Sequence, residues 1–113
     1  MNEADRIRLE HMREAAGHAI RFAAGCTRED LDEDRMRFDA IVREIEILGE
    51  AARAVTGPTR RRIPTVPWKE IVGMRHRLTH AYFAVDAGIV LNTVAMDLPR
   101  LVEVLDGALE ASE

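Results

Sequence analysis

The sequence predicts an all-α protein with a single domain. Apolar residues recur at steps of three and four along most of the chain, which is the period of a helix that buries one face. Residues that start or end helices divide this pattern into four predicted helices. A length of 113 residues suits one domain with its own core, and an apolar content of 47% with 32% charged residues is typical of a globular chain.

The first predicted helix covers residues 3–24, and Gly25 is expected to end it. His11 and His18 share a face of this helix, but no cysteine or acid stands in ligand register with them. We therefore assign the two histidines no chemistry. The expected inward face consists of residues at helical spacing: Ile7, His11, Ala15, His18 or Ala19, and Phe22.

The second predicted helix begins near Thr27 and continues to Val55. Thr27 and Asp30 have the spacing of a capping box, and the acidic run that follows suits a helix N-terminus. A heptad-like apolar seam predicts that this helix packs against others, and its members are Leu31, Phe38, Ile41, Ile45, Leu48, Ala52 and Val55.

Three residues of the second helix need an explanation beyond this seam. Gly49 lies inside the helix, where glycine costs about 1 kcal/mol relative to alanine, so it indicates close approach of another backbone. Glu46 and Glu50 are one turn apart and could act as paired carboxylates. We favour the simpler interpretation, a solvated helix face or ion pairs with Arg43 and Arg53.

A linker is expected after the second helix. The Gly57-Pro58 pair should stop the helix, and residues 59–66 should be stiff and extended because Pro64 and Pro67 bracket their end. Three consecutive arginines in this linker could form a nuclear-localisation-like string, a phosphate contact or simply an exposed loop. The exposed loop is the default interpretation for Arg60, Arg61 and Arg62.

Two more helices are expected in the second half of the chain. Pro67 is suited to the first position of the third helix, Asp86 to the N-cap of the fourth, and Pro99 should kink or restart the fourth. The third helix carries a stripe of Trp68, Ile71, Val72, Arg75, Leu78, Thr79 and Tyr82. The fourth is expected to bury Ile89, Val90, Val94, Leu98, Leu101, Leu105 and Leu109.

Charge is unevenly distributed along the chain. The net charge is −4, yet residues 53–77 hold seven positive side chains and one negative. A basic island in an acidic body favours a local ligand that carries phosphate, although exposed arginines near a loop would give the same composition. The positive residues are Arg53, Arg60, Arg61, Arg62, Lys69, Arg75 and Arg77.

Several classes of protein are disfavoured. The charged N-terminal residues do not form a signal peptide, and no apolar run is long enough to span a membrane. The lone Cys26 has no partner for a disulfide, which fits a reducing cytoplasm. Ser112, in the tail, is the only serine, so serine catalysis is excluded, and we expect no cofactor.

The third helix carries the residues most suited to chemistry. Arg75 and His80 are five residues apart, which on a continuous helix separates them by about 140° around the axis. For both to act on one substrate, the helix must end before His80 or a second copy must face the first, and we expect both. An arginine and a histidine can cleave RNA without metal: the imidazole transfers protons and the guanidinium stabilises charge on phosphorus. Histidines from two chains could divide the acid and base roles.

A zinc site is the alternative for the same helix. His76 and His80 have the i, i+4 spacing of zinc ligands. The metalloprotease pattern needs glutamate where Arg77 stands, no third ligand is apparent, and the two neighbouring arginines would repel a dication. We therefore expect no metal.

Five segments together resemble the HepT-like branch of the HEPN superfamily, whose members are toxins paired with minimal nucleotidyltransferase (MNT) antitoxins. They are DRIRLEHM, TREDLDEDR, IVREIEILGEAARAV, IPTVPWKEIVGMRHRLTHAYFAVD and VAMDLPRL, so the resemblance covers nearly the whole chain. It implies an antiparallel up-and-down bundle of four to five helices over residues 1–113 that forms a homodimer around a shared cleft.

The resemblance also implies roles for single residues. Arg75 and His80 would be the catalytic residues of a metal-independent ribonuclease that acts on cellular RNA. Tyr82 matches the tyrosine that the antitoxin modifies with AMP. Supporting or RNA-contacting roles are expected for His76, Arg77, Lys69, Arg60, Arg61 and Arg62; His76 departs from the family, which most often has asparagine there. The alternative is a non-catalytic helical dimer that serves as a binding module for a nucleotidyltransferase.

Overall fold

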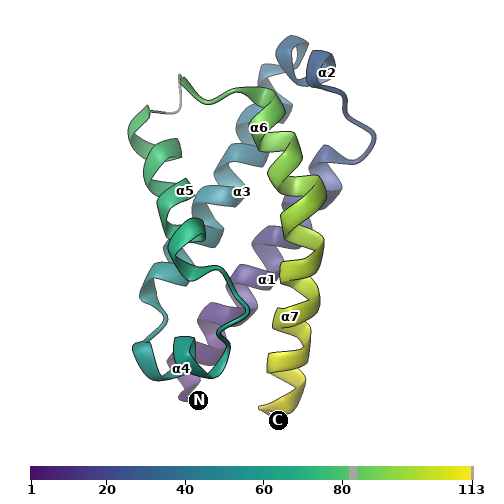
Figure 1. Ribbon diagram of the computed structural model, residues 1–113. Coiled ribbons are helices and arrows are strands. Elements are labelled where there is room, and N and C mark those ends of the chain that lie inside the picture. The colour runs from purple at the N-terminus through teal and green to yellow at the C-terminus, as the bar shows by residue number, and fades with distance from the viewer. Residues whose placement is uncertain (82–83, 113) are drawn as a thin grey trace.

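The helices of this protein run up and down in an antiparallel bundle, seen here in a computed structural model that describes residues 1–81 and 84–112 (Figure 1). The described residues contain no β-strand, which confirms the predicted all-α class. Both termini lie at the same end of the bundle (Figure 1). Three of the four long helical runs are single helices: α1 (Glu3–Ala23), α3 (Arg35–Ala54) and α5 (Trp68–Ala81). The fourth run consists of α6 (Ala87–Asn92), the π-helical turn η2 (Thr93–Asp97) and α7 (Leu98–Ala111) in succession. The helices α2 (Arg28–Glu33) and α4 (Gly57–Arg62) are short.

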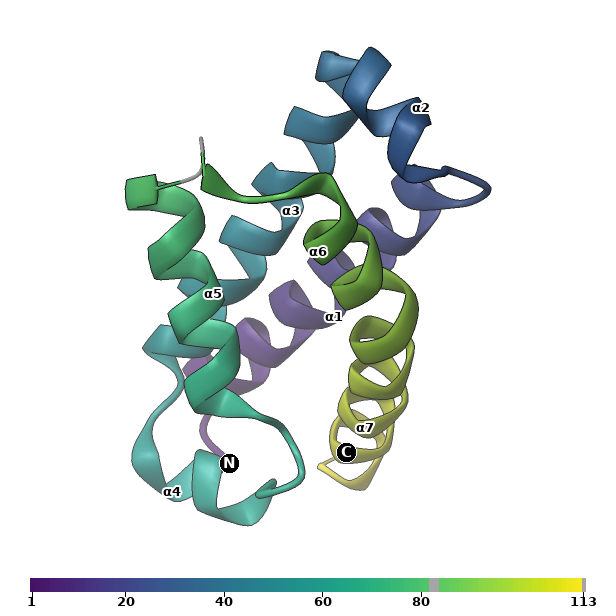
Figure 2. The ribbon, with the colours of Figure 1, turned by 45° about the horizontal axis from the view of Figure 1, so that its top comes forward.

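The core forms where α1 packs against α3 and α7, and α3 packs against α5. The views of Figures 1 and 2 agree that α5 and α7 stand apart on one side, with α1 and α3 behind them. Every member of the seam predicted for the second helix is buried, as predicted. Among the described residues, no helix is both long and apolar enough to cross a membrane.

The inward face predicted for α1 was wrong in part. Ile7 and Phe22 are exposed, at 41% and 37%, and His11 is exposed as well. The buried face is instead rich in alanine, because α1 lies between two other helices and small side chains allow it to approach both. Its buried apolar residues are Leu9, Met12, Ala15, Ala16, Ala19 and Ala23.

The region predicted as the second helix is two helices. The capping box of Thr27 and Asp30 is present, and Gly25 has the positive φ of 74° expected where α1 ends. The break comes at Asp34, whose backbone is not helical and whose carboxylate accepts a hydrogen bond from the Arg37 N–H at 3.1 Å. Asp34 therefore ends α2 and caps α3.

The prediction of an extended linker after the second helix was also wrong, because α4 begins there. The Gly57-Pro58 pair opens α4, with Thr56 at its N-cap, whereas α3 has already ended at Ala54. The buried Asp5 carboxylate accepts hydrogen bonds from the Thr56 N–H at 3.1 Å, the Thr56 hydroxyl, and the Thr59 hydroxyl at 2.6 Å. Burial alone would raise the pKa of Asp5, but these hydrogen bonds outweigh it and hold the pKa below its usual value.

For the last helical run, the prediction from the sequence agrees more closely with the structure. Asp86 caps α6, as predicted, by accepting a hydrogen bond from the Gly88 N–H. The expected interruption at Pro99 appears as the π-helical turn η2 just before α7, where the proline has no N–H to give. Ile89 was predicted to be buried but is 53% exposed.

Candidate functional site

The candidate site is built on the contact between α3 and α5. Gly49 is buried on α3 at the point where Arg75 of α5 crosses it. A Cβ atom at position 49 would lie 2.3 Å from the Arg75 Cβ, which is closer than real Cβ contacts allow. The close approach predicted from a glycine inside a helix is therefore present, and it determines how deeply Arg75 sits between the two helices.

Arg75 is held in a partly buried position that its partners do not fully satisfy. Its side chain is 19% exposed, and its Nη2 lies 3.5 Å from the Glu50 Oε1. Its Nε is buried and has no hydrogen-bond partner among the described residues. An unpaired buried donor costs about 1–3 kcal/mol, so stability does not explain this placement of the guanidinium.

Glu46 and Glu50 of α3 both bond to α5. Glu50 forms the ion pair with Arg75, and Glu46 accepts a hydrogen bond from the Thr79 hydroxyl at 3.2 Å. The sequence interpretation named Arg43 and Arg53, on the same helix, as ion-pair partners, but these two bonds cross to the neighbouring helix instead. The reason is the close packing at Gly49, which brings α5 within reach.

His76 and His80 lie next to each other on an exposed face of α5. Their ring centroids are 4.6 Å apart and the rings are tilted by 50°. Both side chains are exposed, whereas Arg75 is half-buried against α3. The helix runs on to Ala81, so the prediction that it ends before His80 was wrong, and within one chain Arg75 and His80 stay on different faces.

The remaining predicted site residues divide into two groups. The Arg60 side chain makes structural contacts within the fold. Its guanidinium donates hydrogen bonds to the carbonyls of Val55 at 3.1 Å and Ala52 at 2.9 Å, and it lies over the Trp68 ring. Its neighbours in the basic island are exposed, namely Arg61, Arg62, Lys69 and Arg77, the last with a contact to the Met74 sulfur. Tyr82 lies outside the described residues.

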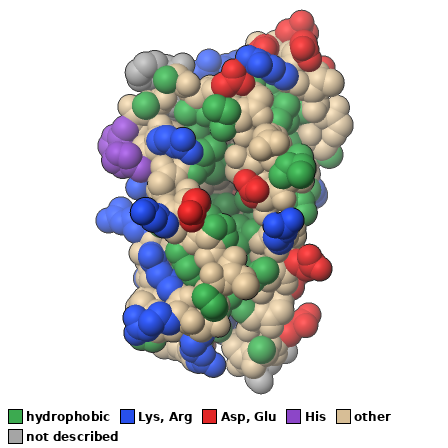
Figure 3. All heavy atoms as spheres, viewed as in Figure 1, with side chains coloured by type: hydrophobic (Ala, Val, Ile, Leu, Met, Phe, Trp, Pro, Cys, Tyr) green, Lys and Arg blue, Asp and Glu red, His purple; other side chains and the backbone are tan. Residues whose placement is uncertain are grey.

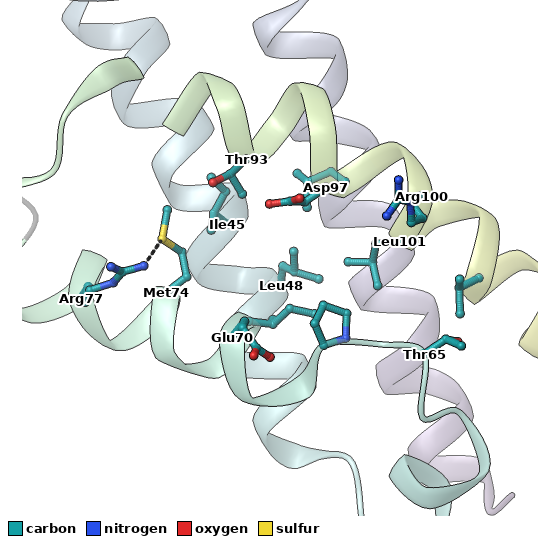
Figure 4. A pocket seen from close by; sticks show the side chains of 14 residues that line it. Ile45, Leu48, Thr65, Glu70, Met74, Arg77, Thr93, Asp97, Arg100 and Leu101 are labelled. Atoms are coloured by element: carbon teal, nitrogen blue, oxygen red, sulfur yellow. Dashed lines mark hydrogen bonds between the residues drawn. The ribbon is translucent and has the colours of Figure 1, made fainter. Parts of the chain in front are cut away.

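A groove of about 410 Å³ separates α5 from the run of η2 and α7. Figure 4 shows its apolar floor, to which α3 contributes Ile45 and Leu48. Figure 3 shows the same face, with charged side chains around exposed apolar atoms and purple histidine atoms at one edge. The charged residues of its lining are Glu70, Arg77, Asp97 and Arg100.

Sequence reasoning missed this groove. Its two walls have ordinary amphipathic patterns, and only the packing of α5 against α3 and of α7 against α1 leaves a gap between them. The described residues include no cluster of three or more histidine, cysteine, aspartate or glutamate side chains that could hold a metal ion.

Comparison with known proteins gives a consistent result. The family model described as ribonuclease HepT-like matches residues 12–107. "Putative RNase TTE0752" of Caldanaerobacter subterraneus subsp. tengcongensis is 38% identical over 93 residues, covering 82% of this chain and 83% of its own. "Probable ribonuclease HepT" of Thermococcus cleftensis is 35% identical over 101 residues, covering 89% of this chain and 92% of its own. No solved structure gives a significant match.

Proposed function

The chain belongs to the HepT-like ribonuclease family, and on that premise we propose that it is a metal-independent endoribonuclease that uses Arg75 and His80 to cleave cellular RNA. The observation that carries the proposal is the placement of Arg75. Its guanidinium is fixed by Gly49 and Glu50 with one buried donor unpaired, an arrangement that costs stability and suits a group kept for electrostatic work.

Each residue has a distinct part in this chemistry. The Arg75 Nη atoms carry the one contact to Glu50, which is long for an ion pair, so a phosphate oxygen can replace the carboxylate. The guanidinium would then stabilise the charge that grows on phosphorus. The exposed His80 imidazole would transfer a proton to or from the reacting ribose oxygens. Lys69, Arg61 and Arg62 would attract the RNA backbone.

We place this reaction at an interface between two copies of the chain. Arg75 and His80 of one chain lie on different faces of α5, so a second copy is needed to bring an arginine and a histidine together. The groove between α5 and α7 offers a face for that copy, because its floor is apolar and its rim has charges of both signs. Under two-fold symmetry such a rim can pair with itself.

Mixed dimers test the shared site directly. Chains with Arg75→Ala and chains with His80→Ala are each expected to be inactive alone. If each site takes its arginine from one chain and its histidine from the other, the mixed dimer keeps one intact site of two, so random mixing should restore about one quarter of wild-type cleavage. No recovery in mixtures shown by mass spectrometry to contain mixed dimers would refute the shared site.

A matched pair of methionines tests where the second copy binds. Met96 is 64% exposed and lies in η2, the turn whose residues Thr93 and Asp97 line the groove. Met36 is 84% exposed near the start of α3. Met96→Glu is expected to shift the protein toward monomer in light scattering, while Met36→Glu leaves the dimer unchanged. Equal behaviour of the two variants would contradict this placement.

We further propose that the protein is the toxin of a toxin-antitoxin pair, silenced when an MNT nucleotidyltransferase adds AMP to Tyr82. Tyr82 follows α5 directly, two residues after His80. A phosphate and a nucleoside there would occlude the site and oppose the negative RNA backbone.

Expression without the antitoxin tests this part of the proposal. Wild type and Tyr82→Phe should stop growth and degrade RNA, whereas Arg75→Ala and His80→Ala should not. Co-expression with the nucleotidyltransferase should add the mass of one adenylate to wild type and none to Tyr82→Phe. Stable complex formation with intact RNA in every case would instead favour a non-catalytic binding module.

A further inference from the structure

We propose that His76 and His80 of the same chain divide the proton transfers of RNA cleavage, with His76 as the general base and His80 as the general acid. The inference rests on the proposed ribonuclease function and adds a second catalytic imidazole to it. Cleavage of RNA needs two proton transfers, one from the attacking 2′-hydroxyl and one to the leaving 5′-oxygen. A single histidine can perform one of them at a time.

The geometry of the pair suits this division. The two rings lie on successive turns of one exposed helix face with their centroids 4.6 Å apart. The rings are tilted by 50° rather than stacked, so they do not cover each other face to face. One phosphodiester held over the pair can therefore place its attacking oxygen near one ring and its leaving oxygen near the other, each within hydrogen-bond reach.

The surroundings of the pair favour one assignment of roles. His80 lies in the last turn of α5, beside the carbonyl end that carries the partial negative charge of the helix dipole, and His76 lies one turn earlier; this position suits His80 for the general acid. Nearby on α5 are the positive side chains of Arg75 and Arg77, and from α3 the carboxylates of Glu50 and Glu46 bond to Arg75 and Thr79.

The resulting step conserves atoms and protons. The 2′-oxygen attacks phosphorus while the neutral His76 accepts its proton, and the bond from phosphorus to the 5′-oxygen breaks while the protonated His80 donates to that oxygen. The products are a 2′,3′-cyclic phosphate and a 5′-hydroxyl. Exchange with water then returns both imidazoles to their starting states. In the shared site proposed above, one chain would supply both imidazoles and the other chain the arginine.

A sulfur substitution separates the two roles. We compare cleavage of an RNA oligonucleotide with that of the same oligonucleotide carrying sulfur in place of the 5′-oxygen at a position that the protein cleaves. A thiolate leaves without a proton, so the sulfur substrate does not need a general acid. The cleavage rate of His80→Gln should be about 10²–10⁴-fold below that of wild type with the oxygen substrate, and most of this loss in rate should disappear with the sulfur substrate. His76→Gln should lose a similar factor with both substrates.

Further measurements complete the test. Mixed dimers of His76→Gln and His80→Gln chains should stay inactive, because no chain then carries both imidazoles. His11→Gln, which changes an exposed histidine on α1, should cleave both substrates like wild type and serves as the matched control. Helix content and thermal unfolding of all three variants should match wild type.

The outcomes are separable. Wild-type cleavage by His76→Gln would overturn the inference, and so would recovery of that variant with the sulfur substrate or recovery in the mixed dimers. If instead wild type cleaves neither substrate, the ribonuclease function itself fails. The bell-shaped pH profile expected of wild type should lose its acidic limb in His76→Gln and its alkaline limb in His80→Gln.

Discussion

Gly49→Ala should separate the stability of this protein from its activity. The substitution adds a single methyl group to the buried face of α3, at the place where Arg75 crosses. The new Cβ would lie 2.3 Å from the Arg75 Cβ, 3.0 Å from its Cγ and 3.2 Å from its Cδ. The nearest of these atoms is attached to the backbone, so the clash cannot be relieved by turning the end of a flexible side chain.

The expected shift follows from these distances. Carbon atoms prefer separations of about 3.5–4.0 Å, so α3 and α5 must part by roughly 1.2–1.7 Å at this point. Overpacking of this kind costs about 1–3 kcal/mol, while alanine in a helix returns about 1 kcal/mol relative to glycine. The free energy of unfolding should therefore fall by no more than about 2 kcal/mol. Cleavage should fall further, by about 100-fold, because a displacement of about 1 Å moves the Arg75 guanidinium out of position.

The assay combines urea unfolding with the rate of RNA cleavage at low substrate. Gly73→Ala is the matched control, since Gly73 lies on α5 close to Arg75 and a Cβ there would meet nothing within 4 Å. That variant should be more stable by about 0.5–1 kcal/mol and should cleave RNA like wild type. A Gly49→Ala protein that matches Gly73→Ala in both measurements would refute the argument that Gly49 positions Arg75.

Three further predictions concern α4 and its surroundings. Asp5→Asn should lower the free energy of unfolding at neutral pH by about 1–3 kcal/mol. Because the pKa of Asp5 is lowered in the folded protein, the extra stability of wild type in urea unfolding should be present above about pH 4 and should disappear as the pH falls through the folded pKa. A stability difference that does not change with pH would contradict this. Arg60→Ala should lower the melting temperature, since the carbonyls at the end of α3 lose their donor, and unchanged melting would show that these bonds contribute nothing. Changing Arg61 and Arg62 together to alanine should leave melting unchanged but weaken RNA binding in filter assays and reduce the salt slope by about 2, and an unaltered slope would remove both from the RNA path.

The sequence predicts well those parts of the fold that depend on residues within a single helix or next to it. The α3 seam is buried as expected because α3 packs against α1 on one side and α5 on the other, so a regular stripe points inward along its length. The close packing at Gly49 could also be predicted, since a glycine inside a helix otherwise weakens that helix. The caps at Thr27 and Asp86 depend only on neighbours within three residues, and both are present.

The parts that were missed depend on contacts far apart in the chain. Residues 57–62 contain glycine, proline and three arginines, a composition that favours a loop. They form α4 because Asp5, about fifty residues earlier, accepts hydrogen bonds from Thr56 and Thr59, while Arg60 folds back onto the end of α3. A window along the sequence contains the arginines but not the carboxylate that fixes the turn.

The candidate site shows the same limit in a form that matters for function. Spacing alone placed Arg75 and His80 on different faces, and two routes to convergence were open: an early helix end or a second chain. The structure closes the first route, because α5 continues through His80 to Ala81. It also shows that the His80 ring lies next to the imidazole of His76, whereas Arg75 packs against α3 and forms an ion pair with it. If this chain cleaves RNA with both residues, the requirement for a partner therefore falls on the arginine, and a heterodimer that combines one intact Arg75 with one intact histidine pair should be enough for catalysis.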